Sequence, residues 1–208
     1  MIVKVCGMRD PENIAALREL DIDWMGLIFY DKSPRYVEQN LEGVSFNGLS
    51  RVGVFVDESF AGIREKAFRY GLNMIQLHGS ETPEFCNQVK RLGVKVIKAI
   101  PVSSKQDLAN ASIYEGVVDY LLLDTKSNVK GGSGEKFDWS MLDAYNADLP
   151  FLLSGGIAPA DVKSIAQIDH PKMAGVDLNS RFEVVPGIKN VESVERFVRE
   201  LRKEIHEV

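Results

Sequence analysis

Short apolar runs recur along the chain, and longer amphipathic stretches separate them. The runs are rich in β-branched and aliphatic residues, which favour strands. Two of the intervening stretches open with Asp10-Pro11 and Thr82-Pro83, where a capping residue precedes a proline at the first helical position. The eight runs are IVKVC (2–6), WMGLIF (24–29), RVGVFV (51–56), MIQLH (74–78), KVIKAI (95–100), YLLLD (120–124), FLLSG (151–155) and GVDLN (175–179).

This alternation predicts an α/β fold. Near-continuous apolar strands separated by helices indicate a parallel sheet covered by helices, and eight such units within 208 residues predict a single-domain (β/α)₈ TIM barrel over residues 1–208. Apolar residues spaced by three or four from Val191 to Ile205 predict a last helix with one buried face. The alternative is a doubly wound open sheet, but its usual glycine fingerprint is replaced by CGMRDP after the first strand.

Composition and charge narrow the class of partner. The net charge is -5 and no run of Lys or Arg occurs, so we expect neither a nucleic-acid nor an anionic membrane partner. No apolar run approaches the roughly 20 residues that span a bilayer, and the N-terminus MIVKVCGM lacks signal-peptide features. Two cysteines, Cys6 and Cys86, are too few for a disulfide framework. We expect a cytoplasmic monomer or homodimer that binds a small molecule.

The carboxyl ends of the strands carry the candidate chemistry, because barrels of this kind build their active sites there. Asp57 and Asp124 have an alternative role as helix caps or loop anchors, and Cys86 lies within a helical pattern that indicates packing or surface. One strand-end histidine, His78, makes a histidine-based metal site improbable. The strand-end set is Cys6, Tyr30, Lys32, Arg35, Asp57, His78, Asp124, Ser154, Gly155, Gly156, Asp177, Asn179 and Ser180.

Two neighbouring loops indicate a phosphate site. SGGI follows the seventh strand and GVDLNS ends the eighth, where many barrels bind phosphate with backbone N–H groups. We expect Gly155, Gly156, Asn179 and Ser180 to hold such an anion, although the glycine pair alone could serve only a tight turn. GGSGEK lacks the ending of a P-loop, and we interpret the irregular stretch 125–137 that contains it as a mobile lid.

Taken in order, KVCGM, GLIFYDKSPRYV, VGVFVDE, IQLHG, YLLLDT, GGSGEKFDW, LLSGGI and GVDLNSRFE resemble the phosphoribosylanthranilate isomerase family nearly end to end. The resemblance implies an Amadori rearrangement in tryptophan biosynthesis, from N-(5-phosphoribosyl)anthranilate to 1-(2-carboxyphenylamino)-1-deoxyribulose 5-phosphate. It implies an aldose-ketose isomerase with a phosphorylated small-molecule substrate and no cofactor or metal.

The resemblance also implies roles for individual residues. Cys6 matches the general base and Asp124 the general acid. Arg35 matches the partner of the anthranilate carboxylate, and Asp177 a polar contact to the ribose. We expect apolar surroundings to keep Asp124 protonated and the site to lower the pKa of Cys6, with Lys4 on the same strand face favouring the thiolate.

One loop departs from the family pattern. NSR (179–181) stands where serine and glycine are common, so Arg181 is left unassigned.

Other functions are alternatives for this sequence. A sugar-phosphate epimerase or a thiamin-phosphate-synthase-like protein would share the phosphate loops, as would a noncatalytic phosphate-binding barrel. An isomerase that also accepts the analogous histidine-pathway substrate is a further alternative, although the KSPRYV loop favours the anthranilate substrate.

Overall fold

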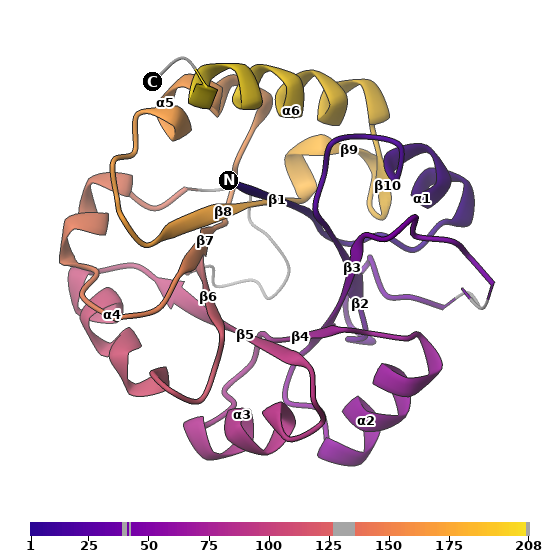
Figure 1. The fold of residues 1–208 in the computed structure, drawn as a ribbon, viewed down its shortest axis with the longest axis horizontal. Helices are drawn as coiled ribbons and strands as arrows, with labels where there is room; N and C mark the ends of the chain where they lie inside the picture. Colours follow the sequence, from indigo (N-terminus) through magenta and orange to yellow (C-terminus); the bar gives the residue numbers. More distant parts are fainter. Residues whose placement is uncertain (39–40, 42, 127–135, 207–208) are drawn as a thin grey trace.

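Eight parallel strands close into a barrel, in the order β1 to β8, with helices around its outside (Figure 1). The computed structural model describes residues 1–38, 41, 43–126 and 136–206. The closed parallel barrel confirms the predicted fold class. The barrel strands are β1 (Ile2–Val5), β2 (Trp24–Ile28), β3 (Ser50–Phe55), β4 (Met74–Leu77), β5 (Lys95–Val102), β6 (Tyr120–Thr125), β7 (Phe151–Leu153) and β8 (Met173–Leu178).

The helices begin where the sequence places their caps. The side chain of Asp10 accepts a hydrogen bond from the N–H of Asn13, and that of Thr82 accepts one from Phe85. The α-helices are α1 (Pro11–Leu17), α2 (Phe60–Arg69), α3 (Pro83–Lys90), α4 (Lys105–Ala109), α5 (Val162–Ala166) and α6 (Val191–His206). The 3₁₀ helices are η1 (Asn110–Tyr114), η2 (Trp139–Ala144), η3 (Pro159–Asp161) and η4 (Ser180–Phe182).

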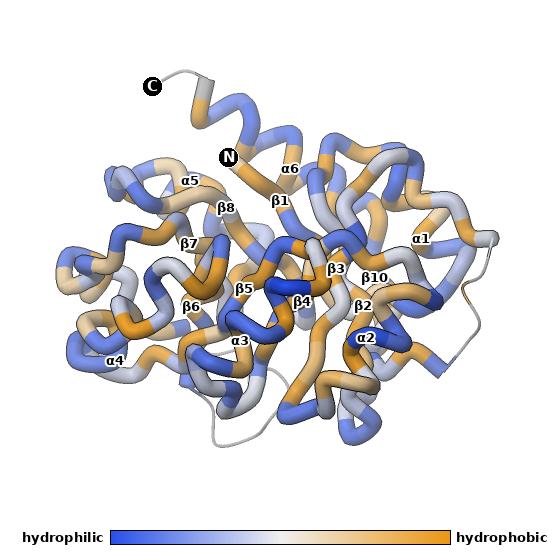
Figure 2. Tube along the Cα trace, turned by 60° about the horizontal axis from the view of Figure 1, so that its bottom comes forward, coloured by the Kyte–Doolittle hydropathy of each residue, from blue (hydrophilic) through white to orange (hydrophobic). Residues whose placement is uncertain are grey.

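Hydrophobic residues fill both sides of the barrel wall. The larger cluster lies between the strands and the helices, where α6 buries Val194, Phe197 and Leu201 as its spacing predicts. Figure 2 shows the corresponding alternation of hydrophobic and hydrophilic positions along α6. A second cluster comes from the alternate strand positions that face the interior: Trp24, Val52, Met74, Ile97, Ala99, Leu122 and Leu152.

The strand-helix alternation is less regular than the sequence predicts. Within the described part of the β2–β3 connection, residues 29–49 form turns and no helix, and Pro34, Gly43 and Gly48 account for this because they disfavour helix. The described part of the β6–β7 connection contains only η2. None of the helices that the described residues form combines the length and the apolar character needed to cross a bilayer.

A two-stranded antiparallel hairpin, absent from the sequence prediction, lies between η4 and α6. It consists of β9 (Glu183–Val185) and β10 (Ile188–Lys189). Pro186-Gly187 forms its turn, and Gly187 has the positive φ of 87° that such a turn requires. The hairpin follows β8 and therefore adjoins the carboxyl end of the barrel (Figure 1).

Candidate active site

The thiol of Cys6 lies inside the barrel, directly after β1. Cys6 is 3% exposed and packs with Ile28 and Val54. Gly26 of β2 makes room for it, because a Cβ atom at that position would lie 2.6 Å from the Cys6 Sγ. The neighbouring strand thus keeps a glycine where the thiol needs space.

Beside Cys6, Lys4 and Asp177 form a buried ion pair across the β1–β8 seam. The two residues are register partners, and Lys4 Nζ donates to Asp177 Oδ1 at 2.9 Å. Burial raises the pKa of Asp177, although the charge of Lys4 opposes that shift. Burial also acts to lower the pKa of Lys4, but Asp177 and Cys6 outweigh it and raise that pKa overall.

The expectation of a lowered thiol pKa is wrong for this structure. Burial raises the pKa of Cys6 above its ordinary value, because a thiolate at this position would lose nearly all its hydration. The positive charges of Lys4 and, more weakly, Lys189 act in the opposite direction. The predicted influence of Lys4 is therefore present but smaller than the effect of burial.

Asp124 lies at the end of β6 and contacts His78. Its Oδ2 is 3.2 Å from His78 Nε2, and the amide of Gln76 is 2.8 Å from His78 Nδ1. When the Gln76 amide N–H donates to Nδ1, the proton of neutral His78 is on Nε2 and is donated to Asp124. Apolar surroundings were expected here, but the Asp124 side chain is 25% exposed and has a polar neighbour. The reason is its position near the end of β6, after the buried Leu121, Leu122 and Leu123.

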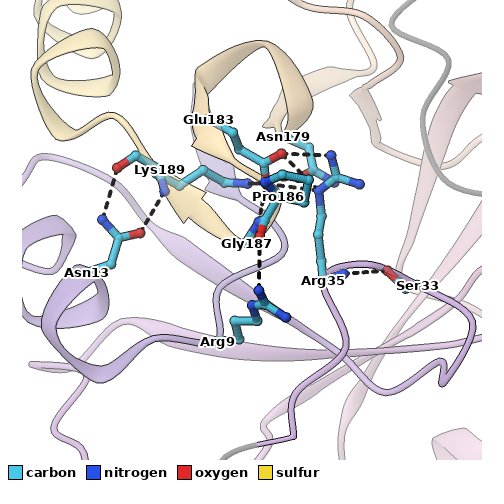
Figure 3. Close-up of polar contacts among 9 residues, drawn as sticks. All are labelled: Arg9, Asn13, Ser33, Arg35, Asn179, Glu183, Pro186, Gly187 and Lys189. Atoms are coloured by element: carbon cyan, nitrogen blue, oxygen red, sulfur yellow. Dashed lines mark hydrogen bonds and ion pairs between the residues drawn. The ribbon is translucent and has the colours of Figure 1, made fainter.

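Arg35 is held by Glu183 of the hairpin, which the sequence prediction missed. Arg35 Nε donates to both carboxylate oxygens at 2.9 and 3.1 Å, and Nη2 donates to Oε2 at 2.7 Å. Lys189 Nζ approaches the same carboxylate at 2.5 Å and also donates to Asn179 Oδ1 at 2.8 Å. Figure 3 shows Glu183 between the two cations.

Arg35 and Asn179 pack on Gly7, the residue that directly follows Cys6. A Cβ atom at Gly7 would be 2.7 Å from Arg35 Cδ and 3.0 Å from Asn179 Oδ1, and its φ of 78° favours glycine as well. The structure therefore brings Arg35 and Asn179 next to the turn that carries the thiol.

The glycines after β7 form the tight turn that the sequence indicates. Gly155 and Gly156 have φ values of 85° and 68°, and Gly155 packs so closely on Thr125 that a Cβ atom would collide with its hydroxyl. Strands β7 and β8 are paired neighbours, so their loops start side by side. Asn179 and Ser180 follow β8 directly, and Ser180 opens η4.

Other candidates have structural explanations. Asp57 anchors a loop by accepting the N–H of Ser80 at 2.6 Å. Cys86 is buried in α3, where burial raises its pKa to about 11 and favours a packing role.

Within the described residues, no group of three or more His, Cys, Asp or Glu side chains is arranged to hold a metal ion. Most of the predicted lid, residues 127–135, lies outside the described residues; Phe137 N–H donates to Thr125 Oγ1 at its base.

Glu183 and Lys189 are the residues of this site that the sequence reasoning missed. The stretch VVPGIK gives the one signal that was available, because a Pro-Gly pair between β-branched residues is typical of a hairpin. Even so, the pattern does not reveal that Glu183 pairs with Arg35, which is 148 residues away in sequence.

Sequence comparisons find relatives over nearly the whole chain. Residues 3–200 match the family model described as N-(5'phosphoribosyl)anthranilate (PRA) isomerase. The N-(5'-phosphoribosyl)anthranilate isomerase of Phocaeicola vulgatus is 47% identical over 99% of this chain and 100% of its own length. That of Parabacteroides distasonis is 45% identical over 97% of this chain and 93% of its own.

Solved structures give the same result. A phosphoribosyl anthranilate isomerase in complex with reduced 1-(o-carboxyphenylamino)-1-deoxyribulose 5-phosphate is 32% identical and superposes with a TM-score of 0.81, covering 98% of this chain and 100% of its own. A monomeric form of the dimeric Thermotoga maritima isomerase has the same identity, TM-score and coverage.

Proposed function

The chain belongs to the N-(5'-phosphoribosyl)anthranilate isomerase family, and we propose that Cys6 and Asp124 catalyse the rearrangement of that substrate as general base and general acid. The reaction is an aldose-ketose isomerisation of tryptophan biosynthesis. The observation that carries the assignment is the convergence of the Cys6 thiol, the Lys4–Asp177 pair and Asp124 at one end of the barrel interior. Lys4 lies close enough to interact with both Cys6 and Asp177, and Asp177 lies close enough to interact with Asp124.

The first proposed step opens the ribose ring. The protonated Asp124 carboxyl donates its proton to the ring oxygen, the bond from that oxygen to C1 breaks, and the nitrogen lone pair forms a Schiff base. His78 holds the Asp124 carboxyl in place through Nε2 at 3.2 Å. The partial exposure of Asp124 leaves one side of its carboxyl open to a substrate.

The second proposed step removes a proton from C2. The Schiff base acidifies this proton, the Cys6 thiolate takes it, and the electrons move to give an enolamine that tautomerises to the ketone. Lys4 supports the thiolate with its positive charge, against the effect of burial. Asp177, fixed by Lys4 at 2.9 Å, is proposed to contact the ribose.

The two ends of the substrate are proposed to bind on either side of these groups. Arg35 pairs with the anthranilate carboxylate, for which a guanidinium is the matching donor. The phosphate binds at the loops after β7 and β8, with Gly155, Gly156, Asn179 and Ser180 as its contacts. The positive φ of the two glycines supports this proposal, because it permits a close backbone approach to an anion.

The anion site gives a prediction that needs no catalysis. Crystals of the protein soaked in sulfate or phosphate are expected to show one tetrahedral anion between Gly155-Gly156 and Asn179-Ser180, held mainly by backbone N–H groups. Electron density in the barrel mouth is the measurement. An anion bound at the ends of a different strand pair, with none here, would contradict the assignment.

A second prediction concerns pH. Catalysis needs Cys6 deprotonated while Asp124 is protonated, and carboxyl groups ordinarily titrate several units below thiols. Between the two pKa values, the fraction of enzyme that carries both the thiolate and the protonated carboxyl is small and does not change with pH. Above the thiol pKa this fraction falls, because nearly every thiol is already deprotonated while the protonated carboxyl becomes rarer. Since burial raises the pKa of Cys6, kcat/KM is expected to decline only above the ordinary thiol value of about 8.5.

The pH profile of kcat/KM from about pH 5 to 10 measures this limb. Any residual activity of Cys6→Ser is expected to lack it, because the thiol that titrates is gone. A decline that starts near pH 7 in the wild-type protein would contradict the buried, raised-pKa thiol.

Complementation tests the function in a cell. A bacterium that lacks its own phosphoribosylanthranilate isomerase is expected to grow without tryptophan when it expresses this chain, and not when it expresses Cys6→Ala at the same level. Failure of the wild-type chain to restore growth would count against the activity.

The oligomeric state is proposed to be a monomer or a homodimer. The Thermotoga maritima relative is dimeric and also has a monomeric form, and light scattering of the purified protein distinguishes the two states.

A further inference from the structure

The hairpin after β8 places a carboxylate between two cations at the edge of the proposed site. We propose that Glu183 is a positioning residue, which fixes the guanidinium of Arg35 so that its second edge can bind the substrate carboxylate. This inference rests on the proposed function and adds to it a residue whose role is to orient the binding group. Figure 3 shows the arrangement, with Arg35 on one side of Glu183 and Lys189 on the other.

The hydrogen bonds leave part of the guanidinium unused by Glu183. They involve Nε and Nη2 of Arg35, and none of them involves Nη1. A guanidinium is planar and has five N–H donors, so a carboxylate on the Nε–Nη2 edge still permits a second carboxylate on the Nη1–Nη2 edge. The contact with Glu183 therefore orients Arg35 without excluding an anionic ligand.

Charge also favours positioning over blocking. Lys189 contacts the same carboxylate, so two basic side chains share one anion. Burial lowers the pKa of Lys189, and the charge of Glu183 opposes that shift. Burial acts to raise the pKa of Glu183, but its bonds to Arg35 and the charge of Lys189 outweigh burial and lower it. Glu183 is accordingly ionised at neutral pH and holds Arg35, whose guanidinium stays charged and keeps N–H donors for the substrate.

The hairpin itself is tied down, so Glu183 has a defined position. Gly187 N–H donates to Glu183 Oε1 at 3.0 Å within the hairpin. Asn13 of α1 exchanges two hydrogen bonds with the backbone of Lys189, at 2.8 and 3.0 Å. The side chains of Arg35 and Glu183 are only 8% and 5% exposed, which limits the alternative conformations open to either.

Glu183→Gln tests the role, because glutamine has the same shape but no charge and turns an N–H₂ group toward the Arg35 donors. KM for phosphoribosylanthranilate is expected to rise at least about 10-fold, the scale of one charge-assisted hydrogen bond, with kcat changed much less. For N-(5-phosphoribosyl)aniline, which lacks the carboxylate, KM is expected to stay within about 2-fold of wild type, as is usual for a site that makes no contact with the change.

A double-mutant cycle with Arg35→Ala shows whether Glu183 acts through Arg35. In the Arg35→Ala background, Glu183→Gln is expected to have no further effect on KM for phosphoribosylanthranilate. Glu81→Gln is the matched control, since Glu81 pairs with Lys98 at 3.1 Å and both side chains are 3% exposed. This control is expected to lower the melting temperature and leave the ratio of the two KM values unchanged.

The outcomes separate this inference from the function on which it rests. An inactive wild-type protein would overturn the function. With an active wild type, an unchanged or lower KM in Glu183→Gln, or an equal rise for both substrates, would overturn positioning; a lower KM would mean that Glu183 competes with the substrate. If Glu183→Gln does not fold, Glu183→Asp is measured in the same way, because it keeps the charge but is too short for the bidentate contact.

Discussion

Cys6→Ala is expected to lower kcat by at least about 10²-fold, the usual scale for losing a general base, while the barrel stays folded. The thiol is one small side chain in a layer with Ile28 and Val54, so its removal leaves a cavity of little more than one atom. Cys6→Ser is expected to lose nearly as much activity, because a hydroxyl is too weak an acid to supply an anion at neutral pH.

Cys86→Ala is the matched control for the thiol. Cys86 is also buried, but it lies in α3, outside the barrel interior that holds Cys6. We expect this variant to lose stability and keep the wild-type kcat. The measurement is the initial rate of isomerisation, with circular dichroism to verify folding. A folded Cys6→Ala that turns over near the wild-type rate would return Cys6 to a packing role.

Asp124→Asn is expected to cost at least about 10²-fold in kcat as well, because an amide cannot donate a proton to the ring oxygen. The fold should survive, since the Asn oxygen can still accept the hydrogen bond from His78 Nε2 that Asp124 accepts at 3.2 Å. Most of the loss should appear in kcat, because the change removes a proton and leaves the size of the side chain unchanged.

Asp119→Asn controls for the loss of a carboxylate at the same strand. Asp119 immediately precedes β6, at the opposite end of the barrel, where it accepts the N–H of Val96 at 2.8 Å and pairs with Lys90. This variant is expected to retain its kcat. If folded Asp124→Asn isomerises the substrate as fast as Asp119→Asn does, Asp124 is not the acid.

The fold was predictable because its signals are local. Each barrel strand lies within or close to an apolar run, and Asp10 and Thr82 cap the helices that their positions indicate. Closure of the sheet followed from the count of strand-helix units rather than from any single residue. The missing helix between β2 and β3 shows the limit, because three breakers in the described part of that loop outweighed the expected alternation.

The site was predictable where position along a strand determines it. Cys6, Asp124 and Asp177 could be chosen as candidates because parallel barrels gather strand ends at one face. The contact between Arg35 and Glu183 was harder to foresee, because these two residues meet only after the whole barrel has closed. The direction of the Cys6 pKa shift depends on how completely neighbouring side chains exclude water, and a strand pattern does not contain that information.

Turnover of the substrate by the purified protein tests the central claim most directly. Phosphoribosylanthranilate is fluorescent, and its loss can be followed after mixing freshly prepared substrate with the wild-type chain, with and without a chelator. We predict a fast loss at the same rate in both samples, with 1-(2-carboxyphenylamino)-1-deoxyribulose 5-phosphate as the product by chromatography. Fluorescence that decays no faster than in a protein-free control would contradict the assignment of this barrel as the isomerase.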